Sequence, residues 1–425
     1  MALFLQRTFY QLLLGLMLPL IPLRLLLRGF KERGYWRHIP ERFGFMGTLP
    51  RDSVWLHAVS VGEARAAAPL VEQFLAQIPA PPVLMTCMTP AGRATLEQLF
   101  GGRVTVRYLP YDLRWAMRRL LRQAQPRLGV VMETELWPNL VRESQRAGVK
   151  LFLVNARLSA RSARGYRKLA TLTRETLGGF VAIAAQTQAD AERLRELGAH
   201  HVSVAGNLKF DIDPPTAQAE LSRVFRERMG ERPVWLVAST REGEERLVLE
   251  AFAHAAPAEV LLVIVPRHPQ RFDDVAALAK SGGLSMQRRS ANETVLPTTR
   301  VWLGDSLGEM FAYYHAADSA LIGGSLLPYG GQNLIEACAV GCPVILGPHT
   351  ENFKQAAKDA IALGAAVRVH DAGTWVSEAT RLMHAPSDRQ KMGAAGQGFT
   401  AAHKGASQRV FAMLSESAAR SAGSN

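Results

Sequence analysis

The sequence predicts an α/β protein built from two doubly wound, Rossmann-like domains that face a central cleft. Three observations support this prediction. Short apolar runs alternate with longer amphipathic runs, which is typical of a parallel sheet with helices on both faces. The alternation is interrupted once, at Pro214 and Pro215, which cannot continue a helix or a central strand. The length of 425 residues suits two or three domains at roughly 150 residues each.

The elements of the first half follow one another in regular order. Apolar runs of strand length cover residues 53–59, 82–88, 127–132, 149–156 and 180–186. Runs with helical periodicity cover residues 63–77, 93–100, 162–177 and 188–199. We expect these pairs to form one parallel sheet.

The second half repeats this rhythm after the proline pair. Strand-like runs cover residues 233–239, 260–268, 299–304, 319–325 and 343–348, and a helix is expected from Glu242. The predicted organisation is an N-terminal membrane-associated segment, a first Rossmann-like domain, a second Rossmann-like domain and a disordered tail. These parts are assigned to residues 1–28, 29–212, 213–415 and 416–425.

The N-terminal segment departs from the average composition. Residues 9–27 are strongly apolar, but Pro19, Pro22 and Arg24 interrupt them. A span needs about 20 apolar residues, so a single tilted span and an interfacial helix both fit. An amphipathic helix packed on the protein itself is a third alternative. The basic residues that follow favour a cytoplasmic location for the rest of the chain.

The overall charge favours an anionic partner. The chain has 50 Lys and Arg against 37 Asp and Glu, a net charge of +13. No zinc finger or basic region points to nucleic acid, so we expect an acidic membrane or a phosphorylated substrate instead. Three cysteines exclude a disulfide scaffold, and we expect them to be reduced and packed as small apolar side chains.

Acidic side chains follow two of the predicted strands. Glu63 opens a helix, where its carboxylate can act as a general base on a hydroxyl. Ser60 and Glu63 also have the spacing of a helix capping box, which is the structural alternative. Glu133 and Glu135 are either site residues or part of an acidic helix start at Pro138.

Three clusters follow strands in the second half. Arg267 and His268 can grip a phosphate, or they form an exposed basic loop. Ser306 and Glu309 have the spacing of a second capping box. The glycine-rich segment 323–336 can offer backbone N–H groups to a phosphate, although a simple turn explains it equally well.

Basic residues also gather in the first half. Arg114, Arg118 and Arg122 share one helix face, which suits either solvent or an acidic substrate. A second basic group contains Arg157, Arg161, Arg164, Arg167 and Lys168. Asp211 and Asp213 form an isolated D-x-D in the predicted linker, and we do not assign them to a metal site.

Together these clusters resemble a known family, the 3-deoxy-D-manno-octulosonic acid (Kdo) transferases of lipopolysaccharide synthesis. The resemblance runs from the N-terminal segment to beyond Phe353. The resemblance is specific because many motifs of the family occur in this chain in the same order. They are HAVSVGE (57–63), MTP-x-G (88–92), YLPYDL (108–113), METELWPN (132–139), NARLSARS (155–162), GNLKFD (206–211), STREGEE (239–245), PRHPQRF (266–272), GDSLGEM (304–310), GGSLLPYGGQNLIEA (323–337) and GPHTENF (347–353).

The resemblance implies a GT-B fold in which the domain at 29–212 binds the acceptor and the domain at 213–415 binds the CMP-Kdo donor, and it implies roles for particular residues. Glu63 matches the catalytic base of the family, and Glu133 and Lys209 match positions that stabilise the transition state. Segments that contact the CMP part of the donor match Pro266, Arg267, Gly308, Glu309, Met310, Asn333, Leu334, Ile335 and Glu336. No cofactor and no metal are expected.

Two positions depart from the family pattern. Arg241 stands where the family often has His. Gln332 stands where the family commonly has the His of GGHNPLE, and an amide cannot carry a proton charge. A charge-stabilising role for that side chain therefore does not carry over, whereas Asn333 and Glu336 remain.

The resemblance implies an enzyme that moves Kdo from CMP-Kdo to the lipid A disaccharide precursor with inversion. The expected partners are the CMP-Kdo donor, that acylated and phosphorylated acceptor, and the anionic inner membrane at its cytoplasmic face. Two alternatives remain open. One is another GT-B nucleotide-sugar enzyme, and the other is a catalytically silent membrane-bound protein that binds nucleotide or lipid.

Overall fold

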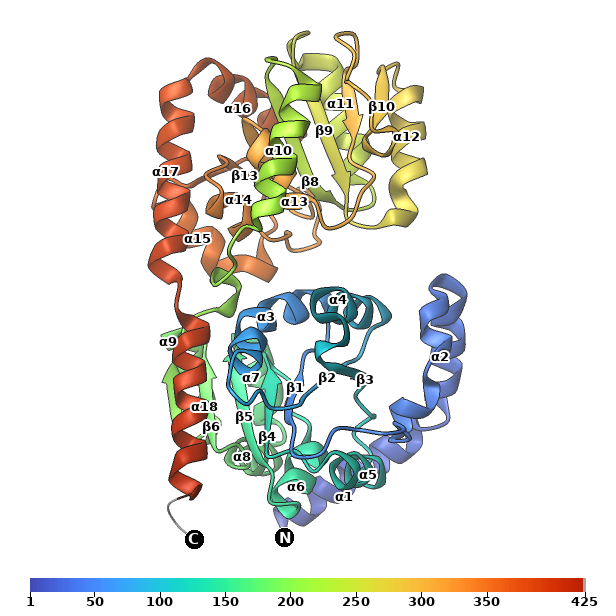
Figure 1. The fold of residues 1–425 in the computed structure, drawn as a ribbon, viewed down its shortest axis with the longest axis vertical. Helices are drawn as coiled ribbons and strands as arrows, with labels where there is room; N and C mark the ends of the chain where they lie inside the picture. Colours follow the sequence, from blue (N-terminus) through green and yellow to red (C-terminus); the bar gives the residue numbers. More distant parts are fainter. Residues whose placement is uncertain (423–425) are drawn as a thin grey trace. The chain divides into compact units, whose positions relative to one another are not determined.

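A computed structural model describes residues 1–422, which fold into two α/β units (Figure 1). The first unit contains Met1–Asp211 together with the chain from Lys404 onward, and the second contains Ile212–His403. Each unit has one seven-stranded sheet whose strand pairs are all parallel. The prediction of two doubly wound domains is therefore confirmed.

The first sheet changes its direction of winding in the middle. Its strand order is β3-β2-β1-β4-β5-β6-β7, so β1 and β4 are neighbours, with His57 opposite Val131. Open parallel sheets bind ligands beyond the carboxyl ends of the strands at such a switch point. The strands are β1 (Val54–His57), β2 (Val83–Cys87), β3 (Thr105–Tyr108), β4 (Leu128–Met132), β5 (Lys150–Ala156), β6 (Ala182–Ala185) and β7 (Val202–Val204).

Helices cover both faces of this sheet, because each strand carries apolar side chains on both sides. One apolar core joins the sheet to α3, α4 and α18, and a second joins it to α5, α6, α8 and α9. The helices of this unit are α1 (Ala2–Met17), α2 (Leu20–Lys31), α3 (Val61–Leu75), α4 (Pro90–Phe100), α5 (Arg114–Ala124), α6 (Pro138–Arg146), α7 (Ala160–Arg167), α8 (Ala170–Gly178), α9 (Gln188–Glu196) and α18 (Ala406–Ala422). Short 3₁₀ helices are η1 (Arg33–Trp36), η2 (Ile39–Phe43), η3 (Gly101–Arg103) and η4 (Leu208–Phe210).

The last helix belongs to the first unit, which corrects the predicted domain boundaries. Phe411 of α18 packs against Phe74 of α3 with ring centroids 5.0 Å apart. Assigning residues 404–415 to the second domain is therefore wrong, since their apolar side chains complete the first core. The disordered tail predicted from residue 416 is also wrong up to Ala422, where α18 continues, and residues 423–425 lie outside the described chain.

Asp211 fixes the start of α18. Its carboxylate accepts hydrogen bonds from the backbone N–H groups of Gly405, at 2.6 Å, and of Ser407. These donors have no carbonyl partner within the helix, so the carboxylate satisfies them as a cap does. The D-x-D of the sequence thus has a structural use at its first residue.

The second unit has the same kind of switch point. Its strand order is β10-β11-β9-β8-β12-β13-β14, and β8 and β12 are neighbours. The strands are β8 (Val234–Thr240), β9 (Leu261–Pro266), β10 (Met286–Arg288), β11 (Val301–Leu303), β12 (Ser319–Ile322), β13 (Val344–Leu346) and β14 (Ala366–Arg368). The helices are α10 (Thr216–Met229), α11 (Glu244–Ala255), α12 (Phe272–Ser281), α13 (Met310–Ala316), α14 (Ile335–Ala339), α15 (Lys354–Ala362), α16 (Ala372–His384) and α17 (Pro386–His403), with 3₁₀ turns η5 (Pro269–Arg271), η6 (Arg289–Ala291) and η7 (Glu351–Phe353).

Aromatic side chains fill the core of the second unit. Trp235 of β8 contacts Phe252 of α11 and Trp375 of α16 edge to face, at 6.2 and 5.9 Å. On another side, Phe225 of α10 packs on Trp302 of β11 at 5.1 Å. The three cysteines are all buried and unpaired, as expected.

The N-terminal segment forms two helices separated by a bend. In the described chain no single helix has both the length and the apolar character needed to cross a membrane. Together, residues 2–17 and 20–30 meet that test by length and composition, but they are bent by 50°. The predicted helix 162–177 is likewise two helices, α7 and α8.

The Asp211 cap is expected to stabilise the first unit. Asp211→Ala should lower its free energy of unfolding by about 2 kcal/mol, because two backbone N–H donors at the helix start lose a charged acceptor. Asp211→Asn keeps one acceptor oxygen and should lose less. Native-state hydrogen exchange at amides of β1 and α3 measures both values. Equal stability of the Ala variant and the parent would contradict the cap.

Candidate active site

The first group of site residues lies at the carboxyl ends of β1, β4 and β5. Glu63 is buried in the first turn of α3, whose N-cap is Ser60. Its carboxylate accepts hydrogen bonds from the N–H of Val59 at 2.9 Å and from the Ser60 hydroxyl at 3.2 Å. The predicted capping box is not formed, because the Ser60 side chain bonds the carboxylate and no backbone N–H, and Glu63 accepts from the N–H of Val59 instead of that of Ser60.

The surroundings of Glu63 favour its protonated form. Burial and then the negative charge of Glu133 raise the pKa of Glu63 to about 7, with a smaller contribution from Glu135, against the lowering by the two hydrogen bonds. A carboxyl group with a pKa near neutrality can both take up and release a proton. The arrangement therefore suits general base chemistry.

Glu133 and Lys209 form an ion pair beside this carboxylate. Lys209 Nζ lies 3.0 Å from Glu133 Oε1. Glu133 has a φ of 58°, a left-handed conformation that non-glycine residues rarely adopt, and its N–H bonds the carbonyl of Val154 on β5. The structure thus brings together Glu63, Glu133 and Lys209, which the sequence analysis singled out separately.

Asparagine side chains hold the turn that carries Lys209. Asn207 Oδ1 accepts a hydrogen bond from the Lys209 N–H at 3.0 Å, and Asn155 Oδ1 accepts one from the Leu208 N–H at 3.0 Å. Asn155 is fully buried and has a φ of 52°. Asn207 is in the GNLKFD motif and Asn155 in NARLSARS, but only the three-dimensional contacts reveal this role.

The wall of the site contains groups that the sequence analysis did not assign. His57 is fully buried, and its Nδ1 lies 3.1 Å from the Thr86 carbonyl, to which it must donate. Burial lowers the pKa of His57 to about 4, so the ring is neutral. Its ring contacts Trp137 at 6.0 Å, and Trp137 Nε1 donates to Glu135 at 2.5 Å. Pro138 begins α6 as predicted, but Glu133 and Glu135 precede the helix instead of forming its first turn.

In the second unit, guanidinium groups gather near the end of β9. Pro266 ends the strand, and the Arg267 N–H bonds the carbonyl of Thr240 on β8 at 3.0 Å. Arg241 Nη1 lies 3.3 Å from His268 Nε2. Burial and then the charges of Arg241 and Arg267 lower the pKa of His268. Two cations close to one imidazole make this strand end suitable for an anion.

The segment with Gly308, Glu309 and Met310 has no capping box, so that alternative is wrong. The Ser306 hydroxyl bonds the hydroxyl of Tyr313 at 2.8 Å instead. Glu309 accepts a hydrogen bond from Arg289 at 2.9 Å, and α13 begins only at Met310. Gly308 has a φ of 80°, which requires glycine at this turn.

The segment 333–336 combines polar side chains that bond one another with apolar side chains that are buried. The Asn333 side chain accepts from the Ile335 N–H at 3.1 Å and donates to Glu336 Oε1 at 3.1 Å. Leu334 and Ile335 are buried, so their side chains pack in the core. Any contact that these two residues make with a ligand would therefore be through the backbone.

A buried carboxylate that the sequence analysis missed organises the glycine-rich loop. Glu244, only 1% exposed, begins α11. It accepts hydrogen bonds from the N–H groups of Arg241 at 2.9 Å, Gly324 at 2.5 Å and Leu326 at 2.9 Å. Glu244 is part of the STREGEE motif, but nothing in the sequence shows that it spans two loops.

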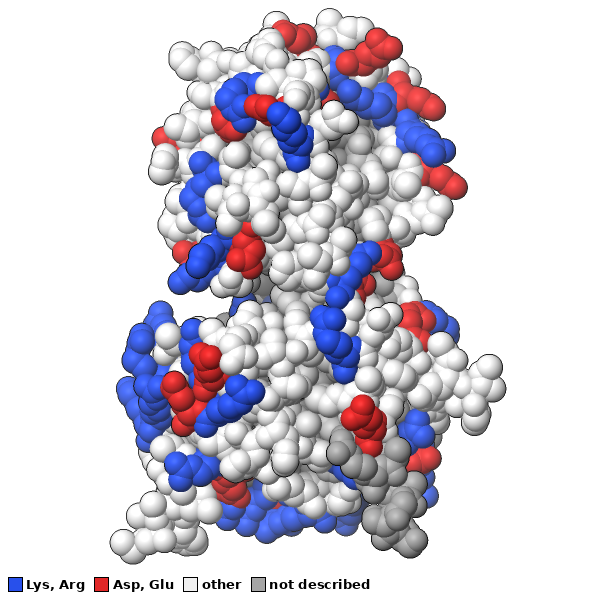
Figure 2. All heavy atoms as spheres, turned by 90° about the vertical axis from the view of Figure 1, so that its left-hand side faces the viewer, with Lys and Arg blue, Asp and Glu red and all other residues white. Residues whose placement is uncertain are grey.

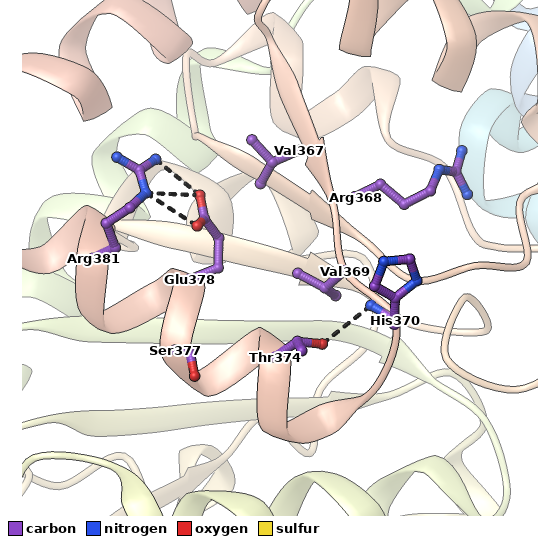
Figure 3. A pocket seen from close by; sticks show the side chains of 8 residues that line it. All are labelled: Val367, Arg368, Val369, His370, Thr374, Ser377, Glu378 and Arg381. Carbon is purple, nitrogen blue, oxygen red and sulfur yellow. Dashed lines mark hydrogen bonds and ion pairs between the residues drawn. The ribbon is translucent and has the colours of Figure 1, made fainter.

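A cavity of about 460 Å³ lies away from these clusters, beside β14 and α16 (Figure 3). Arg381 is paired with Glu378 in its wall, and the Thr374 hydroxyl accepts from the His370 N–H. Its lining residues are Val367, Arg368, Val369, His370, Thr374, Ser377, Glu378 and Arg381. None of the predicted site residues is among them. Across residues 1–422, no three His, Cys, Asp or Glu side chains are placed to hold a metal ion.

Comparison with known proteins gives matches along nearly the whole chain. The family model described as 3-Deoxy-D-manno-octulosonic-acid transferase (kdotransferase) matches residues 37–212. A 3-deoxy-D-manno-octulosonic acid transferase of Bordetella pertussis is 46% identical, over 96% of this chain and 99% of that protein. One of Haemophilus influenzae is 36% identical, over 96% of this chain and 98% of that protein.

Among solved structures, a putative UDP-N-acetylglucosamine 2-epimerase from Listeria monocytogenes is similar with a TM-score of 0.58. It is 15% identical, and the match covers 86% of this chain and 96% of that chain. At this identity the likeness concerns the fold alone. It confirms the predicted GT-B class of two Rossmann-like domains.

The raised pKa of Glu63 predicts a pH-dependent stability. The Glu63 carboxyl group binds its proton more tightly in the folded protein than in the unfolded chain, where its pKa is 4.5. Stability of the folded protein is therefore lost as the pH rises from 4.5 through about 7. Glu63→Gln lacks this loss. The difference in unfolding free energy between Glu63→Gln and the parent should therefore shift in favour of the variant by as much as about 3 kcal/mol from pH 4.5 to pH 8. Urea unfolding at a series of pH values measures this difference. Glu192→Gln, on an exposed position of α9, should show no such trend.

The Glu244 contacts predict that this side chain shapes the glycine-rich loop. Glu244→Gln places an amide N–H against backbone donors, so the second unit should lose about 2 to 4 kcal/mol of unfolding free energy. Glu242→Gln, on the exposed neighbouring position, should be neutral. Thermal unfolding of both variants compares them directly, and an unchanged stability of Glu244→Gln would show that the loop does not need the carboxylate.

Proposed function

The chain belongs to the family of 3-deoxy-D-manno-octulosonic acid (Kdo) transferases, and from this premise we propose its acceptor and its mechanism. The protein is a glycosyltransferase that transfers Kdo. We propose that the donor is CMP-Kdo and that the acceptor is a hydroxyl group of the acylated, phosphorylated disaccharide precursor of lipid A. The observation that carries the mechanism is the buried Glu63 carboxylate beside the Glu133–Lys209 ion pair.

In the proposed reaction, Glu63 removes the proton from the acceptor hydroxyl. The oxygen then forms a bond to the anomeric carbon of Kdo, and the bond between that carbon and the phosphate oxygen of CMP breaks. CMP leaves with the bonding electron pair. Because the displacement is direct and has no covalent enzyme intermediate, the configuration at the anomeric carbon inverts.

The base is supported by its surroundings. Two hydrogen bonds fix the orientation of the Glu63 carboxylate, and burial keeps its pKa near 7. At that pKa a substantial fraction of the group is ionised near neutral pH, and the ionised form accepts a proton readily. The rate should therefore rise as the pH increases through about 7.

Cationic groups would balance the charge of the departing phosphate. Lys209 and Arg267 are the proposed stabilisers, because both are cations next to strand ends. His268 follows Arg267 directly, Arg241 Nη1 lies 3.3 Å from His268 Nε2, and the charges of both arginines act on that ring. Arg241 therefore supplies a permanent charge at the position where the family often has His, and the neutral Gln332 adds none.

We propose that the protein works at the cytoplasmic face of the bacterial inner membrane. The acyl chains of the proposed acceptor keep it in a bilayer, and its phosphates suit the arginine groups of the first unit. The exposed apolar side chains of α1 and α2 support this location.

The first experiment measures product mass. Purified full-length protein is incubated with the lipid A disaccharide precursor and with CMP-Kdo generated in situ. A mass gain of one or more Kdo units is expected, and Glu63→Gln should lower turnover by roughly a hundredfold or more because the base is lost. Binding of CMP to this variant should be nearly unchanged.

Controls separate the alternatives. Binding of CMP without any mass gain would favour a different acceptor or a silent binding protein. Preference for UDP over CMP would favour another GT-B nucleotide-sugar enzyme. Loss of CMP binding in Glu63→Gln would contradict the role of Glu63 as a base.

A further inference from the structure

The first helix of the chain presents its polar face to the protein. Gln6, Arg7, Tyr10 and Gln11 recur at helical spacing, so they share one side of α1. Their partners lie on α5–α8 or just before them. The contacts are Gln6 Oε1 with the Leu172 N–H at 2.8 Å, Arg7 Nε with Glu175 Oε2 at 2.7 Å, the Tyr10 hydroxyl with Asp112 Oδ2 at 2.7 Å, and Gln11 Nε2 with Asn139 Oδ1 at 2.6 Å.

These contacts involve parts of the first unit that are themselves well fixed. Asp112 and Asn139 are buried, and Asp112 also accepts hydrogen bonds from the backbone N–H groups of Asn139 and Leu140. Tyr10 and Gln11 thus join an existing buried network at the start of α6. The helix is docked by specific polar contacts and not merely laid on the surface.

The opposite face of α1 is apolar and uncovered. Phe9, Leu12 and Leu16 are 57%, 68% and 70% exposed. The exposed apolar surface continues on α2 with Leu20, Leu23, Leu27 and Phe30. A helix on a soluble protein normally turns such side chains inward, so this reversed orientation needs an apolar environment outside the protein.

Arginines of α5 and α6 lie next to the docked helix. A hollow of about 430 Å³ between α1 and α5 has Leu14, Leu18 and Trp115 together with Arg114 and Arg118 in its walls. A hollow lined by both apolar side chains and two guanidinium groups matches the chemistry of an acyl chain that carries a phosphate.

Arg114, Arg118 and Arg146 all pair with one carboxylate, the buried Glu143, at 3.4, 2.6 and 2.9 Å, so cations outnumber anions here and the arginines also repel one another. After burial, the charges of Arg146 and Arg114 lower the pKa of Arg7, and those of Arg7, Arg146 and Arg114 lower the pKa of Arg142. Figure 2 shows Lys and Arg gathered along the base of the first unit, the end at which Figure 1 draws α1, α6 and α8. A nearby anion would relieve this repulsion.

We propose that α1 and α2 form a monotopic anchor that rests in one leaflet of an anionic bilayer. In this arrangement α1 keeps its polar face docked on the first unit, its apolar face enters the lipid, and Arg114, Arg118 and Arg142 contact lipid phosphates. The inference extends the membrane location proposed above and does not depend on the transferase reaction.

A spanning anchor conflicts with the same observations. The 16 residues of α1 alone extend about 24 Å, which is less than the hydrocarbon thickness of about 30 Å, and the longer pair of α1 and α2 is bent by 50°. Crossing the membrane would also release the four polar contacts and place Gln6, Arg7 and Gln11 in lipid, where unsatisfied polar groups are costly.

Cysteine labelling of the full-length protein in membrane vesicles tests the topology. The chain's own cysteines are buried, so Ala2→Cys adds one accessible thiol at the start of α1. A membrane-impermeant maleimide should label it in inverted vesicles only, like the control Ser281→Cys on the second unit. Labelling of Ala2→Cys in right-side-out vesicles would show that the segment spans and would overturn the proposal.

A second experiment tests the lipid-facing side chains with purified full-length protein. Leu12→Gln/Leu16→Gln changes exposed residues only and should weaken binding to vesicles of phosphatidylglycerol and phosphatidylethanolamine roughly tenfold or more. Leu247→Gln/Leu363→Gln replaces exposed leucines of the second unit and should have no effect. Equal binding by the two double variants would overturn the apolar contact.

A third comparison tests the arginines and identifies the headgroup. Arg118→Gln/Arg142→Gln should weaken binding to these anionic vesicles roughly tenfold, and binding to purely zwitterionic vesicles should not change. The charge-matched control Arg223→Gln/Arg246→Gln should retain binding. A similar loss in both double variants would mean that only the net charge matters, which would overturn the assignment of a phosphate site to α5 and α6.

Discussion

All strands of each sheet run parallel, so their carboxyl ends share one edge, and this constraint determines where the polar groups gather. In the first unit, Glu63 after β1, Glu133 after β4 and Asn155 at the end of β5 all lie at this edge. In the second unit, Arg267 after β9 and the glycine-rich loop after β12 lie at the corresponding edge. The helices on both faces bury the strands and thereby fix the edge on which the chemistry depends.

Both edges hold buried carboxylates and strained backbone, but they use them differently. In the first unit the strain falls on Glu133, a charged residue with a positive φ that lies against Lys209. In the second unit it falls on Ser239, at the end of β8, near the loop that Glu244 gathers through backbone N–H groups. One carboxylate set is suited to proton transfer, whereas Glu244 is a structural acceptor.

The sequence was sufficient for the long elements and insufficient for the short ones. Apolar runs predicted the central strands, because those strands are buried on both faces. Edge strands such as β7 (Val202–Val204) and β10 (Met286–Arg288) contain only three residues with polar members, so no local pattern reveals them. Motif order indicated Glu63, Glu133 and Lys209, but the links through Asn155 and Glu244 join segments distant in sequence. The position of α18 could not be predicted either, because its apolar stripe does not indicate which of the two cores it packs against.

The return of α18 to the first unit has a consequence for how the chain is made. The second unit, Ile212–His403, is one continuous stretch and is complete when its last residue has left the ribosome. Most of the first unit precedes the second, yet its core and the Asp211 contacts need residues that are synthesised only after the whole second unit. The part of the protein that emerges first is therefore the last to be finished, and a ribosome that stops before residue 404 releases a complete second unit attached to an open first one.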